Sequence, residues 1–223
     1  MITLITIVLS LLQFINGEPA NKFESTNGCL QYNTDHGSNY QHPYYPTSGF
    51  RHVNITDNGV RIMRFGVLGK EDGYIRLSPI MYPYDGTEMF EIILSGWENT
   101  KTQVRRYKRT SPSQHDDENV LKEQSSIGML SVYEPFMFTM AVHPNGLVQL
   151  TRDGDSQPFL VFRDPKSAST NYIGFSNYNV PVAFFYDCPL EADRSICDGV
   201  VMVESQFHMF CSIRNPLRGY GNV

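Results

Sequence analysis

Short runs of apolar and β-branched residues, separated by turn signals, fill the middle of this chain. Asn-Gly and Asp-Gly steps suit turns that need positive φ, and they occur at Asp85-Gly86, Asn145-Gly146 and Asp153-Gly154. Asp57-Asn58-Gly59 and Glu71-Asp72-Gly73 are similar signals. Between them we predict nine strands, at residues 60–68, 74–80, 89–97, 102–108, 136–142, 147–152, 159–163, 172–176 and 182–186. This spacing predicts an all-β fold, an antiparallel β-sandwich of jelly-roll or lectin-like type.

Three segments allow a finer prediction. Both faces of 89–97 are mostly apolar, so we expect an inner strand with Ile92 and Leu94 buried. Basic residues crowd 102–109, which is typical of an exposed or edge strand. The polar segment 111–126 is expected to be a long mobile loop, with at most one or two helical turns at 117–124.

The two ends of the chain suggest secretion. Residues 4–15 form an apolar stretch that is too short to cross a bilayer but suits a signal peptide, which we place at 1–17. A leader at 18–49 is polar, and its Tyr40–Pro46 segment holds two prolines and is expected to be extended. The sandwich domain follows at 50–188, and a C-terminal extension at 189–223. No later segment is long enough to span a membrane.

The four cysteines fit the same secretory route. An even number in a secreted chain indicates two disulfides, and four cysteines allow three pairings. We expect Cys29–Cys188, because the two ends of a sandwich often lie close together, and Cys197–Cys211 to tie the extension, while the other two pairings stay open. Asn54 begins the sequon Asn54-Ile55-Thr56 and is the expected glycosylation site.

Charge and motifs argue against several classes of function. A net charge of −5 gives no basic field for nucleic acid. The histidines have no metal-ligand spacing, and no G-x-S-x-G motif places a serine nucleophile, so we expect no metal and no catalytic residue.

A specific resemblance comes from the blocks Tyr74-Ile75-Arg76-Leu77-Ser78-Pro79 and Met89 to Thr102, the latter containing Gly96-Trp97-Glu98-Asn99-Thr100-Lys101. Together with Tyr172-Ile173-Gly174-Phe175-Ser176, these blocks resemble the farnesoic acid O-methyltransferase-like domain, over roughly residues 60–187. The family name implies methyl transfer from S-adenosylmethionine to farnesoic acid. A methyltransferase of the Rossmann type holds that cofactor with a strand, a glycine-rich turn and the start of a helix. The sequence contains no G-x-G-x-x-G motif that would form such a turn, so we expect no cofactor.

Trp97, Asn99, Thr100, Lys101 and Arg105 are the candidate ligand-binding residues. Trp97 would stack on a sugar or another planar ligand, with polar donors beside it. In the alternative, which we favour, Trp97 fills the core, and the side chains of Asn99 and Thr100 form hydrogen bonds with the backbone of a tight turn. The sequence therefore favours a secreted, non-catalytic recognition module for an extracellular glycan, lipid or protein surface, with the methyltransferase as the alternative.

Overall fold

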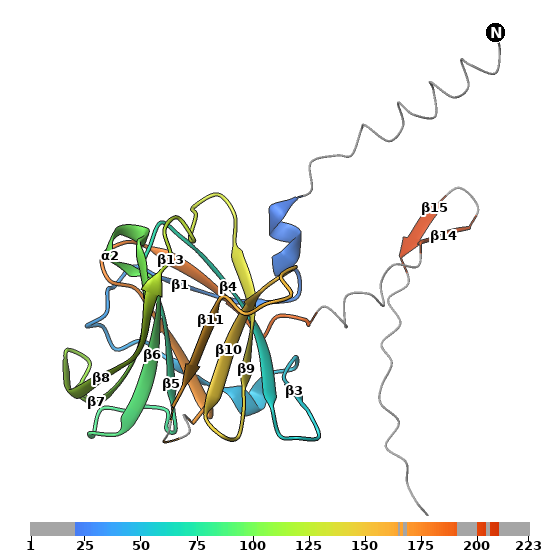
Figure 1. Cartoon of the computed structure of the whole chain (residues 1–223). Helices are drawn as coiled ribbons and strands as arrows, with labels where there is room; N and C mark the ends of the chain where they lie inside the picture. The colour runs from blue at the N-terminus through green and yellow to red at the C-terminus, as the bar shows by residue number, and fades with distance from the viewer. Residues whose placement is uncertain (1–20, 165, 167–168, 191–199, 204–205, 210–223) are drawn as a thin grey trace, which may run out of the picture.

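The computed structural model describes residues 21–164, 166, 169–190, 200–203 and 206–209, and within them two antiparallel sheets lie face to face (Figure 1). The seven-stranded sheet has the order β1 (Leu30–Thr34), β13 (Val182–Tyr186), β4 (Arg61–Gly69), β9 (Phe136–Val142), β10 (Leu147–Arg152) and β11 (Leu160–Arg163), with β3 (Asn54–Ile55) paired to β4. The six-stranded sheet has the order β2 (Tyr44–Pro46), β12 (Tyr172–Ser176), β5 (Gly73–Ser78), β6 (Glu88–Ser95), β7 (Lys101–Ser111) and β8 (Gln114–Ser125).

The remaining elements are short. They are the 3-10 turns η1 (Lys22–Thr26) and η2 (Thr47–Gly49), the turn α2 (Gly96–Asn99), and the hairpin of β14 (Val200–Val203) and β15 (Gln206–Met209). The predicted sandwich is confirmed, and all nine predicted strands are present, with ends displaced by at most three residues.

The core lies between the sheets because the strands alternate inward and outward side chains. Met63, Phe65 and Val67 of β4 point inward, and so do Ile92 and Leu94 of β6. Strand β6 pairs with β5 on one side and β7 on the other, so the prediction of an inner strand with Ile92 and Leu94 buried is confirmed.

Two predictions about the next segment are wrong. Strand β7 is not an edge, because β8 pairs along its whole length, and β8 occupies the segment that we expected to be a loop. The reason is that β8 is held by its backbone ladder and by cross-strand ion pairs rather than by an apolar face. Lys108–Asp117, at 2.8 Å, and Lys101–Glu123, at 3.1 Å, are two of these pairs. The strand therefore carries no hydrophobic alternation that a sequence pattern can detect.

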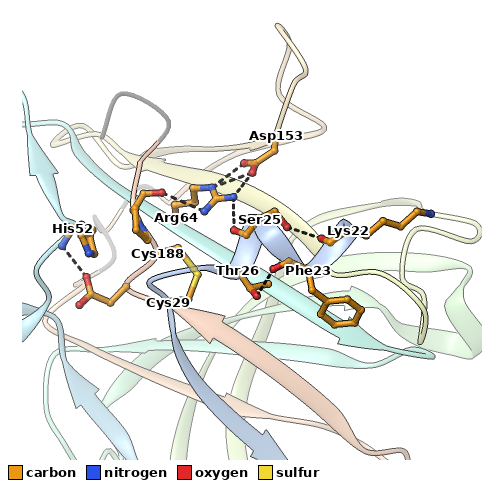
Figure 2. Close-up of a disulfide and its surroundings, with 11 residues drawn as sticks. Lys22, Phe23, Ser25, Thr26, Cys29, His52, Arg64, Asp153 and Cys188 are labelled. Atoms are coloured by element: carbon orange, nitrogen blue, oxygen red, sulfur yellow. Dashed lines mark hydrogen bonds and ion pairs between the residues drawn. A yellow bond between two sulfur atoms is a disulfide. The ribbon is translucent and has the colours of Figure 1, made fainter. Parts of the chain in front are cut away.

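The segment that we expected to lie on the domain as a leader contributes an edge strand to each sheet, β1 and β2. Cys29 just before β1 is disulfide-bonded to Cys188 just after β13, as predicted (Figure 2). Beside this bond the buried Arg64 donates to the Ser25 carbonyl at 3.0 Å and to the Pro189 carbonyl at 3.2 Å, and it pairs with Asp153. Arg64 and the disulfide thus fasten both ends of the domain to β4. The predicted Cys197–Cys211 pair and the predicted signal peptide lie outside the described residues.

Candidate functional site

A pocket of about 630 Å³ opens beside α2, at the margin of the six-stranded sheet. Six separate segments meet there: the β1–β2 connection, the β4–β5 connection with β5, α2, β7, β8 and the β12–β13 connection. They contribute Ser38, Asn39, Glu71, Asp72, Tyr74, Trp97, Glu98, Arg105, His115, Tyr178 and Asn179. Only long-range folding brings these residues together, and the volume is typical of a small-molecule site.

The turn α2 presents Trp97 to this pocket. Trp97, Glu98 and Asn99 are successive residues with φ of 52°, 61° and 60°, so the turn is left-handed. Such a conformation costs roughly 1–2 kcal/mol for each non-glycine residue. It turns the indole outward, and Trp97 is 47% exposed, so the expectation that Trp97 fills the core is wrong.

Hydrogen bonds hold this strained turn in place. The Asn99 amide donates to the Leu130 carbonyl at 2.9 Å and accepts from the Leu130 N–H at 3.3 Å, and the Thr100 hydroxyl donates to the Trp97 carbonyl. The expected bond to the backbone of the turn is therefore confirmed for Thr100, whereas Asn99 bonds the backbone of a distant segment. Lys101 Nζ lies 4.3 Å from the Trp97 ring centroid and 3.1 Å from Glu123. Of the five candidate residues, the pocket contains Trp97 and Arg105.

Two adjacent carboxylates, Glu71 and Asp72, form the acidic end of the pocket. Glu71 is 8% exposed, and its Oε2 has no hydrogen-bond partner among the described residues. Asp72 is 7% exposed, and burial together with the charge of Glu71 raises its pKa to about 6. A Cβ built on Gly96 would lie 3.3 Å from Asp72 Oδ1, so the glycine lets this carboxylate pack against α2.

Arg105 adds a basic group to the lining of the pocket. Its guanidinium donates to Glu91 at 2.7 Å and to Glu118 at 3.0 Å, and His115 Nε2 lies 3.1 Å from the same Glu118 oxygen. Burial opposes the charge on Arg105, but Glu91 outweighs it and raises the Arg105 pKa. The prediction that the basic segment 102–109 is exposed is therefore wrong for Arg105 and Arg109, which lie in a partly buried ionic network.

Sequence analysis missed Glu71, Asp72, Tyr74, Glu98 and Tyr178. Glu71-Asp72-Gly73 was interpreted as a turn signal only, and it does turn the chain, but from one sheet to the other rather than within a hairpin. A pair of acids followed by glycine gives no further signal, since its partners Trp97 and Tyr178 are distant in sequence. The described residues contain no group of three or more His, Cys, Asp or Glu placed to hold a metal ion. They also contain no helix long and apolar enough to cross a membrane.

Comparisons with known proteins identify the domain. A family model described as farnesoic acid O-methyltransferase matches residues 38–190, which is more than half of the chain. No curated protein matches the chain significantly.

Similar solved structures include a β-glucanase from Bacillus licheniformis, at 12% identity and a TM-score of 0.37, covering 70% of this chain and 95% of that one. Porphyranase B from Zobellia galactanivorans has 9% identity and a TM-score of 0.32, covering 72% of this chain and 75% of that one. At these scores the likeness assigns no residue a role.

Proposed function

We propose that this chain, which belongs to the farnesoic acid O-methyltransferase family, is an extracellular module that recognises a glycan in the pocket beside α2. The observation that carries the proposal is the exposure of two aromatic side chains, Trp97 and Tyr178, in a pocket whose other lining residues, apart from Tyr74, are polar or charged.

The aromatic residues suit the apolar faces of sugar rings. Trp97 is 47% exposed and Tyr178 is 54% exposed, although large aromatic side chains are usually covered. A flat aromatic face gives a sugar ring contact area, with a polar edge left free for hydrogen bonds. The left-handed turn that turns Trp97 outward costs stability, and such strain is concentrated at functional sites.

The polar residues suit sugar hydroxyls. Asn39 and Asn179 offer both donors and acceptors, Ser38 a hydroxyl, and Glu71, Asp72 and Glu98 carboxylate acceptors. A lipid chain would leave these groups buried and unpaired, which is costly, so the lining favours a glycan over a lipid.

Two features support an extracellular setting. The Cys29–Cys188 disulfide is of the kind that persists in oxidising compartments. Asn54, the proposed glycosylation site, is an exposed residue of β3.

Trp97 provides a direct test, because it is the only tryptophan in the chain. We expect oligosaccharides bound in the pocket to change its fluorescence, and Trp97→Ala to weaken binding about tenfold, measured by calorimetry. Tyr133→Ala is the matched control, since Tyr133 is a highly exposed aromatic residue that does not line the pocket.

We would reject the proposal if a broad set of neutral, amino and acidic oligosaccharides changed neither the Trp97 fluorescence nor the heat measured by calorimetry. Calorimetry with S-adenosylmethionine tests the alternative. One-to-one micromolar binding of that cofactor would favour methyl transfer.

A further inference from the structure

We infer that the acidic end of this pocket binds a protonated amine, so that the preferred ligand is an amino sugar with a free ammonium group. The inference rests on the proposed glycan site and specifies its ligand class.

The first argument is the missing partner of Glu71. Its side chain lines the pocket although the residue is only 8% exposed, and Oε2 accepts no hydrogen bond among the described residues. The nearest cation, Lys70, is itself largely exposed, with Nζ 3.8 Å from the other oxygen, Oε1. A buried carboxylate oxygen without a donor is costly, and a ligand that brings a charged donor removes this cost.

The second argument is the carboxylate beside it. Asp72 is also buried, at 7% exposed, and it lines the same pocket. Burial and the charge of Glu71 raise the Asp72 pKa to about 6, which means that two adjacent negative charges are not fully compensated inside the pocket. A cation seated between them would favour the ionised form of both.

The basic groups nearby do not supply this compensation. Arg105 is already paired with Glu91 and Glu118, and Lys101 with Glu123. The third carboxylate of the lining, Glu98, is exposed on α2 and adds to the negative potential. An anionic or sulfated sugar would therefore meet a repulsive wall at this end.

An ammonium group suits the geometry better than a metal ion. It carries three donors, which two adjacent carboxylates can accept, whereas Ca²⁺ takes six to eight oxygen ligands. The exposed indole of Trp97 lies in the same pocket and offers a flat face to a sugar ring. A sugar ring stacked on Trp97 would carry its amine toward Glu71 and Asp72.

The test compares three tetrasaccharides that differ at one substituent, namely β-1,4-linked glucosamine, N-acetylglucosamine and glucose. Calorimetry with the full-length chain just above the Asp72 pKa of about 6, where that carboxylate is mostly ionised, should show the glucosamine oligomer binding about tenfold or more tightly than the other two. Glu71→Gln and Asp72→Asn should each remove that preference, so that the three oligomers bind with similar affinity.

Two controls keep the test decisive. Asp57→Asn removes an exposed carboxylate in the turn before β4 and should leave the preference unchanged. Glu98→Gln alters the exposed acid of the lining without touching a buried group, and it should reduce the preference even if the buried variants fold poorly.

The possible failures are distinguishable. Equal binding of the three oligomers would overturn the amino-sugar inference and leave glycan recognition standing. Binding of none of them, nor of any other glycan, would overturn both. If a chelator abolishes binding, a metal ion and not an ammonium group bridges the carboxylates, and the inference is overturned. If a lysine peptide binds and the amino sugar does not, the site recognises protein, and the inference is likewise overturned.

Discussion

The Arg76 guanidinium and the Glu91 carboxylate form a fully buried ion pair on the outward side of the six-stranded sheet. Burial by itself would raise the pKa of Glu91, but Arg76, Arg105 and Arg109 hold it well below its ordinary value. The Tyr107 hydroxyl also donates to Glu91 Oε2, at 2.9 Å. One carboxylate thus organises three basic side chains and places Arg105 at the pocket.

Loss of this carboxylate should be strongly destabilising, because it would leave buried guanidinium groups without their counter-charge. We expect Glu91→Gln to lower the free energy of unfolding by about 3–5 kcal/mol. Urea denaturation measures this, with Glu123→Gln as the control for an exposed pair, whose loss should cost about 1 kcal/mol or less. Equal, small effects of both variants would show that the buried network is not held by Glu91.

Asp72→Asn should stabilise the fold at neutral pH. The Asp72 pKa is raised from 3.8 to about 6, so the folded chain keeps a proton that the unfolded chain has released, and the ionised form is the unfavourable one. The gain in melting temperature should be present above about pH 6 and vanish below about pH 4. Asp57→Asn should show no such dependence, and a stability loss in Asp72→Asn at neutral pH would contradict the assignment.

His42 should make stability fall on acidification. Its ring is buried, its Nε2 lies 2.7 Å from the Gly37 carbonyl, and its Nδ1 lies 3.0 Å from the Tyr32 hydroxyl. Burial lowers its pKa from 6.5 to about 4, so between these values only the unfolded chain takes up the proton. The contribution is complete above about pH 6.5 and is lost as the pH falls toward 4.

The pH dependence of unfolding tests the role of His42. His42→Gln should flatten the slope of the free energy between those two values. His36→Gln, a change at a mostly exposed histidine, should keep it. If His42→Gln leaves the slope of the unfolding free energy against pH unchanged, other groups cause the pH dependence.

Removal of the Cys29–Cys188 bond should be costly, because it closes a loop with a sequence separation of 159. We expect the double variant Cys29→Ser with Cys188→Ser to lose about 2–5 kcal/mol in the free energy of unfolding. Non-reducing peptide mapping should recover this pair, and the prediction of Cys197–Cys211 is tested in the same experiment. A peptide joining Cys29 to Cys211 would contradict both.

Strands with an apolar inward face could be located from the amino-acid sequence alone. Segments such as 136–142 and 172–176 were predicted with their observed ends, because a short run of apolar and aromatic residues bounded by polar or turn residues is a local feature of the sequence. The polar strand β8 was missed for the same reason, since it is exposed apart from Leu121 and Gln124, which are half-buried, and only Leu121 packs against the core.

The packing of the two sheets determines which distant segments share a site. Trp97 was identified from its sequence block, but its exposure depends on a left-handed turn that Asn99 holds against Leu130. Glu71, Asp72 and Tyr178 became part of the pocket because the chain crosses between sheets after β4 and again after β12. The chain crosses between the sheets because both sheets must bury their apolar faces against one core. This requirement involves residues far apart in the sequence, so a local sequence pattern does not reveal it.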